Sequence, residues 1–276
     1  MTRNRVYILT AVSAAAYVLL CWIFGTDMFS FKSGVFWDHS AYSNSSIFTY
    51  VLLVLIIAAG VYQASQLPAN GVEIERGAVT ETEGQTEDPH FWRLLTGNVY
   101  WSILWLPLRF YVGRDWLSAG EEKLRSSAWM SGGSALKGYW TSATAVPATG
   151  SPKITYDWYR NFLHYMLVHD YYTWFAKLIA VGEFLVGLGI LVGALVAIAA
   201  FFGTLMNMTY LLAGSTSSNP VLFGLTVFLI LGWKVAGYFG IDRILLPALG
   251  APWKAGKLFG GEGIATHTPA RTPETA

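Results

Sequence analysis

The chain has 276 residues, of which 54% are hydrophobic and only 13% are charged. Soluble proteins usually carry about 25% charged residues, so this composition favours a protein that contacts membrane lipid. The formal net charge of +1 gives no broad positive field, and we expect no nucleic-acid partner. Because Cys21 is the single cysteine, an intrachain disulfide and a cysteine-ligated cluster are excluded.

The first element is an apolar run at residues 6–24, which follows two arginines as a secretory signal would. The run is long enough to cross a bilayer, and Leu20 stands where a lipoprotein signal would need a small residue. We therefore interpret it as an uncleaved membrane span. A second span is predicted at residues 47–66, so that residues 1–66 form a transmembrane hairpin.

The hairpin is followed by residues 67–90, which are acidic, rich in Gly and Thr, and without an apolar period. This composition indicates an exposed linker. Residues 91–250 then contain four further apolar stretches of about 20 residues, the length that crosses a bilayer. They lie at residues 97–118, 174–192, 194–213 and 219–240. The predicted fold class is an all-α membrane protein with six transmembrane helices and a polar tail at residues 251–276.

The connection at residues 119–172 is too long for a simple turn. Within it, apolar side chains recur at the spacing of an amphipathic helix, at Tyr159, Phe162, Leu163, Met166 and Leu167. We expect this helix to lie on the membrane surface and to cap the outer end of a four-helix bundle.

Small residues predict how the spans pack. Gly182 and Gly187 leave small surfaces on the span at residues 174–192, and such surfaces let membrane helices approach closely. These glycines place Glu183, the carboxylate of this span, on a packed face rather than towards lipid. Gly193 predicts a very short turn into the next span.

The distribution of basic residues favours a cytoplasmic location for both ends of the chain. Most basic residues of the opposite side fall in the long connection before residue 172, and long connections count less in the positive-inside rule. On the cytoplasmic side this orientation places Arg3, Arg5, Arg76, Arg93, Arg243, Lys254, Lys257 and Arg271. We expect an integral protein of a prokaryotic cytoplasmic membrane.

Four segments after residue 91 together resemble the DoxX/DoxD family of small membrane proteins. They read LRFYVGRDWLSAGEEKL, FAKLIAVGEFLVGLGILVG, GTLMNMTYLLAGSTSSNPVLF and AGYFGIDRILLPALG. The shared positions are Arg109, Gly113, Gly120, Lys123, Gly182, Glu183, Gly187, Asn207, Asn219, Pro220, Gly237, Asp242 and Arg243. The resemblance implies a four-helix transmembrane bundle linked to sulfur or redox chemistry, since the DoxD member is a subunit of a thiosulfate:quinone oxidoreductase. The N-terminal hairpin is additional to this pattern.

Ionisable side chains inside spans usually face the bundle interior and form pairs. Glu183 and Arg109 are the candidates for such a pair, which would either fix the helix register or face a substrate or quinone as catalytic groups. Lys234 lies near the end of its span, where we expect it to extend to the surface. For Asp242 and Arg243, beyond that span, helix capping or a surface ion pair is expected.

The resemblance implies a quinone as cofactor, with hydrogen-bond partners for its oxygens at Trp105 and Asn207 besides the charged pair. An anionic sulfur donor would bind at the outer face near Lys123 and Lys177, with Arg125 and Arg160 close by. No haem, metal or flavin is predicted, because the spans contain no histidine and the chain has no dinucleotide fingerprint. The histidines lie elsewhere, at His39, His90, His164, His169 and His267.

The leading functional hypothesis is a quinone-linked subunit of an oxidoreductase that passes electrons from thiosulfate or a related sulfur donor to quinone. The alternative is a non-catalytic accessory subunit of a larger electron-transfer or photosynthetic complex, which contacts other membrane or redox subunits through the hairpin. A transporter ranks third, because no inverted repeat with broken helices is visible.

Overall fold

The computed structural model describes residues 1–24, 43, 45–72, 74 and 88–251. Within this part of the chain every regular element is a helix, as the predicted all-α class requires. Several predictions concern residues outside the described ranges. These are most of the acidic linker at 75–87, the tail at 252–276, and His39, Arg76, Lys254, Lys257, His267 and Arg271.

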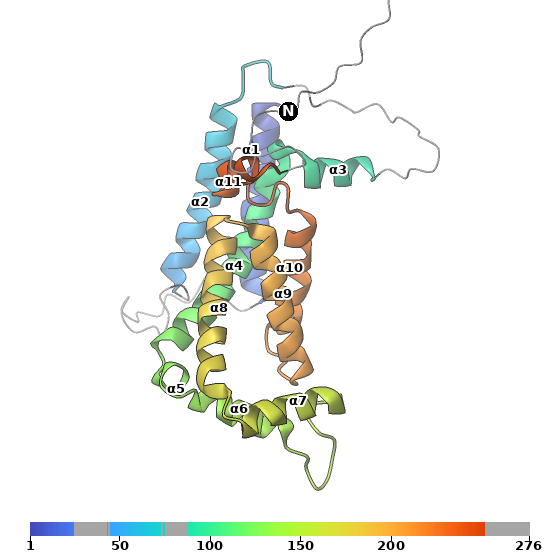
Figure 1. Cartoon of the computed structure of the whole chain (residues 1–276). Helices are drawn as coiled ribbons and strands as arrows, with labels where there is room; N and C mark the ends of the chain where they lie inside the picture. Colours follow the sequence, from blue (N-terminus) through green and yellow to red (C-terminus); the bar gives the residue numbers. More distant parts are fainter. Residues whose placement is uncertain (25–42, 44, 73, 75–87, 252–276) are drawn as a thin grey trace, which may run out of the picture.

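The helices form an elongated bundle with short helices lying across both ends (Figure 1). α3 (His90–Gly97) crosses one end, and α6 (Ser134–Thr144) and α7 (Asp157–Val168) cross the other. Among the described residues, the helices long and apolar enough to cross a membrane are α1 (Arg3–Ile23), α2 (Ser46–Ser65) and α8 (Tyr172–Val192). α9 (Val196–Leu212) and α10 (Asn219–Leu231) are apolar but shorter. The chain therefore has the character of a membrane protein.

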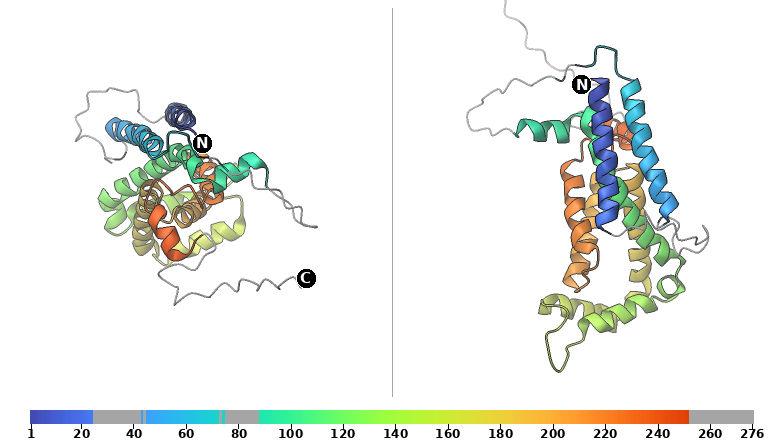
Figure 2. Two further views of the ribbon diagram at one scale, coloured as in Figure 1. Left: turned by 90° about the horizontal axis from the view of Figure 1, so that it is seen from above. Right: turned by 180° about the vertical axis from the view of Figure 1, so that it is seen from behind.

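α1 and α2 form the predicted N-terminal hairpin and lie side by side (Figure 2). The hydroxyl of Ser45 caps α2 by accepting a hydrogen bond from a backbone N–H in its first turn. The helices approach closely where Gly60 faces Thr10, since a Cβ on Gly60 would lie 2.7 Å from the Cβ of Thr10. Ser13 Oγ donates a hydrogen bond of 2.9 Å to Ile103 O, which ties the hairpin to the rest of the bundle.

The third predicted span begins differently from the helix expected over residues 97–118. A 3-10 helix, η2 (Val99–Trp105), comes first, and α4 (Leu106–Arg125) follows it. Asn98 starts η2, because its side-chain oxygen accepts a hydrogen bond of 2.9 Å from Tyr100 N. α4 then continues beyond residue 118 to Arg125, so that its last turn carries Lys123.

α4 and α8 pack backbone against backbone through glycine. A Cβ added to Gly187 of α8 would lie 2.6 Å from Leu117 Cα, and one added to Gly120 of α4 would lie 2.6 Å from Phe184 Cα. Carbon atoms in contact normally lie about 3.5–4.0 Å apart, so both positions require glycine. The packing confirms that Glu183 lies on a packed face, where only 2% of the residue is exposed.

The turn from α8 to α9 is as short as predicted. Gly193 ends α8 with φ 72°, in the left-handed region that glycine adopts without strain, and Leu195 follows with φ 48°. Asp242, the first residue of α11 (Asp242–Leu249), caps α9 from a distance in the sequence. Its carboxylate accepts hydrogen bonds from Leu195 N at 2.6 Å and from Val196 N at 3.0 Å, so the expected capping role is confirmed.

The sixth predicted span, residues 219–240, is too long. α10 ends at Leu231, and the chain continues through turns to α11. Gly232, Gly237 and Gly240 weaken helix formation in this stretch. Gly232 is also fixed by packing, since a Cβ there would lie 2.8 Å from Cε2 of Trp105.

The connection from α4 to α8 forms a cap of three helices, α5 (Ser127–Met130), α6 and α7. The predicted amphipathic helix is confirmed as α7, which buries Tyr159, Leu163 and Met166 and leaves Phe162 exposed. Burial raises the pKa of Tyr159 to about 12, so its hydroxyl stays protonated at neutral pH. This hydroxyl donates a hydrogen bond of 3.0 Å to Thr209 O of α9 and fastens the cap to the bundle.

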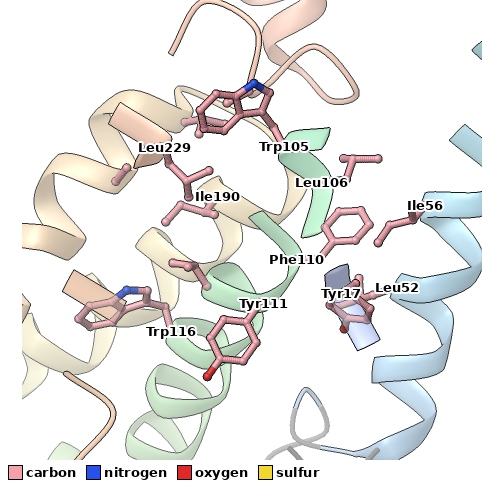
Figure 3. Close-up of a cluster of buried hydrophobic side chains, with 14 of the residues drawn as sticks. Tyr17, Leu52, Ile56, Trp105, Leu106, Phe110, Tyr111, Trp116, Ile190 and Leu229 are labelled. Atoms are coloured by element: carbon pink, nitrogen blue, oxygen red, sulfur yellow. The ribbon is translucent and has the colours of Figure 1, made fainter. Parts of the chain in front are cut away.

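One cluster of buried side chains joins the hairpin to the other helices (Figure 3). Tyr17 of α1 and Leu52 and Ile56 of α2 lie on the side of the cluster that faces Phe110 of α4. Further side chains, including Trp105 of η2, Ile190 of α8 and Leu229 of α10, extend the cluster. Hairpin and bundle therefore share one core.

Candidate functional site

A cavity of 1240 Å³ is lined by α8 and α9, with α4 on its inner side and α6 and α7 at the end of the bundle. We call it the α8–α9 cavity. The two helices are joined at the Gly193 turn and separate towards α6 and α7 (Figures 1 and 2). A Cβ on Gly189 would lie 3.2 Å from Ala199 Cβ, whereas one on Gly182 would meet Met206 Sδ alone, at 3.7 Å. Small-molecule sites usually measure about 300–1,000 Å³, so this cavity has room for a whole ligand.

Glu183 of α8 is the centre of the polar part of this cavity. Its side chain is 3% exposed, and Tyr210 of α9 donates a hydrogen bond of 2.7 Å to its Oε1. Lys123 of α4 places Nζ 2.7 Å from Oε2 and forms an ion pair. The same ammonium lies 5.1 Å from the ring centre of Trp129, within cation–π distance. Three helices thus bring a carboxylate, an ammonium and a phenol to one place in the wall.

The ion pair explains how an apolar helix holds a buried carboxylate. An ionised carboxylate taken out of water loses several kcal/mol of solvation, and a hydrogen-bonded counter-ion offsets part of that loss. Lys123 keeps 21% of its side chain exposed, so its ammonium retains some contact with the surroundings. The Lys123–Glu183 pair is neutral as a whole. The Lys123 ammonium has three N–H donors, so it can contact Glu183 and also donate a hydrogen bond to a ligand.

The charge of the lining favours a neutral or cationic ligand over an anion. Among the described residues, the charged side chains that line the cavity are the carboxylates of Asp115, Glu122 and Glu183 and the ammonium of Lys123. A cleft lined mainly by one sign of charge repels ligands of that sign. A small anion such as thiosulfate therefore finds little attraction at this position.

Arg109 does not pair with Glu183, so that prediction is wrong. Its buried guanidinium donates hydrogen bonds of 2.9–3.1 Å to four backbone carbonyl oxygens. Two belong to Ile190 and Leu191 in the last turn of α8, where a cation satisfies carbonyls that the helix leaves free. The others belong to Ala236 and Phe239, before α11. Arg109 holds these two segments together and lies outside the cavity lining.

Trp105, one of the two residues expected to bind a cofactor, is also outside the cavity lining. Its Nε1 donates a hydrogen bond of 2.8 Å to Leu95 O, and its ring packs against Gly232. Both contacts are structural, since they join η2 to α3 and to the end of α10.

Asn207, the other residue expected to bind a cofactor, is fully buried beside the cavity. Neither atom of its amide has a hydrogen-bond partner among the described residues, and the same holds for Trp116 Nε1. That nitrogen lies 3.2 Å from the Cβ position of Gly203, which is one turn before Asn207 on the same face of α9. Tyr210 follows one turn later and its ring lies 6.4 Å from that of Trp116. Polar groups without partners therefore lie next to the Glu183 site.

The basic residues expected to bind an anionic sulfur donor are not brought together. Arg125 and Arg160 each form an ion pair of 2.5 Å with a carboxylate of their own helix. Lys177 is exposed on α8 and lies outside the cavity lining. Lys123 lines the cavity but its ammonium contacts Glu183.

Two residues of the site, Tyr210 and Trp129, are absent from the sequence-based prediction. The spacing of Tyr210, three residues after Asn207 in the same span, was a usable signal, because residues three apart share a helix face. Trp129 has no such signal, since it lies in a long connection whose path the sequence does not define. The described residues contain no group of three or more His, Cys, Asp or Glu side chains placed to hold a metal ion.

No family model matches the chain, and no significant match is found among curated proteins or solved structures.

Proposed function

We propose that the chain is a quinone-binding subunit of a membrane oxidoreductase, and that the α8–α9 cavity binds the quinone head. The observation that carries the proposal is the Glu183–Lys123–Tyr210 group in the wall of an otherwise largely apolar cavity. A quinone combines an apolar ring with carbonyl oxygens that accept hydrogen bonds, and the cavity offers both kinds of surface. The resemblance to the DoxX/DoxD family points to the same cofactor.

In this proposal α4, α9 and α10 lie in the membrane with α8 and complete the six-span architecture. A helix of 21 residues such as α8 measures about 31 Å, close to the thickness of the hydrocarbon core. The helices α3 and α7, which lie across the two ends of the bundle, are then near the two membrane surfaces. The ends of the chain are cytoplasmic, and the membrane is the cytoplasmic membrane of a prokaryote.

Each polar residue has a role in holding the head. The Lys123 ammonium donates a hydrogen bond to one quinone oxygen, while Glu183 holds that ammonium in place through the ion pair of 2.7 Å. Tyr210 fixes the other carboxylate oxygen, so the carboxylate cannot turn away from Lys123. A bound quinone would supply the capacity to accept electrons, which the side chains of this site lack.

The electron donor binds elsewhere in this proposal. The cavity lining is mainly anionic among its charged groups. Of the basic residues expected at the outer face, Arg125 and Arg160 are engaged in ion pairs, and Lys177 lies outside the cavity lining. A thiosulfate-like donor is therefore assigned to a partner subunit or to another face of the complex, and this chain contributes the quinone site.

A second candidate is a non-catalytic accessory subunit of an electron-transfer or photosynthetic complex. The observation that favours it is the outward face of the hairpin, where Ile8, Val12 and Leu19 of α1 and Val54 and Val61 of α2 are about half exposed or more. This face fits lipid or the spans of another subunit. Two results together would favour this candidate. The chain would purify in a stable complex with redox subunits, and the chain itself would bind no quinone.

Quinone binding to the purified chain tests the proposal. Trp116, Trp129 and Trp140 line the cavity, so a bound quinone should quench tryptophan fluorescence. The variant Lys123→Met/Glu183→Gln removes the polar group and leaves no unpaired buried charge. Loss of one hydrogen bond to a charged group corresponds to about 1.5–3 kcal/mol, so we expect affinity to fall about 10- to 100-fold.

The matched control is Arg125→Met/Glu121→Gln, which removes a neighbouring ion pair of the same helix outside the cavity lining. This control should keep wild-type affinity. Unchanged affinity in the first double variant, or an equal loss in the control, would contradict the proposal.

A further inference from the structure

We infer that the ligand of the α8–α9 cavity carries a long alkyl or isoprenoid chain, which lies between α8 and α9 and reaches the bilayer there. The inference rests on the proposed function, because it concerns the same site. It adds a requirement that recognition of the head alone does not impose, and it defines the route by which the ligand enters.

The cavity opens on the side that faces lipid. Leu178 and Leu185 of α8 line the cavity although 55% and 57% of each residue is exposed. Phe202 and Leu205 of α9 also line the cavity, although 51% and 46% of each residue is exposed. α8 is one of the helices long and apolar enough to span a membrane, so its exposed apolar side chains meet lipid. The cavity therefore has an apolar opening between the two helices.

The lining is divided into a polar part and a long apolar part. Glu183, Lys123 and Tyr210 form the polar part, whereas α9 lines the cavity as far as Leu195 near the α8–α9 turn. From Leu195 to Tyr210 the helix rises about 22 Å, which is far longer than a single quinone ring. A head bound at Glu183 leaves the apolar stretch unfilled, and a flexible apolar chain attached to the head fills it.

The gain from binding the chain is modest, because lipid already surrounds that chain before it binds. Transfer from lipid to an apolar protein surface brings no hydrophobic gain, and only closer van der Waals packing remains. We expect the chain to improve affinity about tenfold, which corresponds to about 1.4 kcal/mol.

Gly182 provides a probe that separates the chain from the head. It lines the cavity, and an added Cβ meets Met206 Sδ alone, at an ordinary 3.7 Å. Gly182→Leu therefore places a branched side chain in the cavity without forcing apart the α4–α8 contact. Gly224 of α10 is the control position, since an added Cβ there has no neighbour within 4 Å among the described atoms, and it does not line the cavity.

The experiment compares two ligands in lipid nanodiscs, a methyl-substituted 1,4-benzoquinone and the same head with a decyl chain. Wild type and Gly224→Leu should bind the decyl compound about tenfold more tightly than the chainless one. Gly182→Leu should lose this preference and bind the two compounds with about equal affinity.

Equal wild-type affinities for the two compounds, or an equal loss of both in Gly182→Leu, would overturn the inference and leave the head site standing. If wild type binds neither compound, the proposed function itself fails, and the inference fails with it. The two failures are therefore distinguishable.

Discussion

Replacing Gly187 by alanine should separate α4 from α8 and destabilise the whole bundle. An added Cβ would lie 2.2 Å from Leu117 N and 2.6 Å from Leu117 Cα. Non-bonded heavy atoms lie about 3.5 Å apart or more, so α4 would have to move away from α8 by about 1.3 Å. Both neighbouring atoms belong to the backbone and cannot turn aside as a side chain would.

The magnitude follows from two opposing effects. Overpacking of this kind costs about 1–3 kcal/mol, and the backbone contact favours the upper end. Alanine favours the helix over glycine, which stabilises the folded state by about 1 kcal/mol. We therefore expect Gly187→Ala to lower the free energy of unfolding by about 2 kcal/mol. Gly182→Ala on the same helix meets no clash and should raise it by up to about 1 kcal/mol.

Reversible unfolding in mixed micelles, followed by circular dichroism, measures both variants under identical conditions. The expected separation between them is about 3 kcal/mol. If the two variants differ by less than about 0.5 kcal/mol, the close approach of α4 and α8 through glycine is refuted.

Three further substitutions test the buried polar groups. Lys123→Met should lower the free energy of unfolding by about 3 kcal/mol because it leaves Glu183 buried without its counter-ion, and adding Glu183→Gln should recover most of that loss in the same assay. Arg109→Met should cost at least about 3 kcal/mol, because four carbonyl oxygens lose a charged donor, while the fraction that folds should bind quinone normally in the fluorescence assay. Asn207→Leu should raise ligand-free stability by about 1 kcal/mol, since neither amide atom has a partner among the described residues. Thr204→Val, whose hydroxyl bonds within α9, serves as its control, and a loss in Asn207→Leu larger than in this control would show that the amide has a partner.

The positions of the most apolar helices follow from the sequence. The spans expected at residues 6–24, 47–66 and 174–192 become α1, α2 and α8 with shifts of at most three residues. Length and apolar content decide these helices, and neither depends on distant contacts. The third and sixth spans differ because Asn98 starts a 3-10 helix and Gly232 packs against the Trp105 ring.

The partner of Glu183 could not be predicted, because it depends on the register between two antiparallel helices. Gly120 packs against Phe184, and this contact places Lys123 one turn from Glu183. Arg109 is eleven residues before Gly120, which corresponds to about 16 Å along α4 towards the other end. Glycine spacing shows which face of a helix is packed, but several registers would satisfy the same glycines.

The most direct test of the central claim is an experimental structure of the protein with a chain-bearing benzoquinone. We predict that the ring lies between α8 and α9, that one of its oxygens is within hydrogen-bond distance of Lys123 Nζ, and that its chain extends past Gly182 to the lipid. A quinone bound on the hairpin surface, or a ring located away from Glu183 and Lys123, would contradict the account.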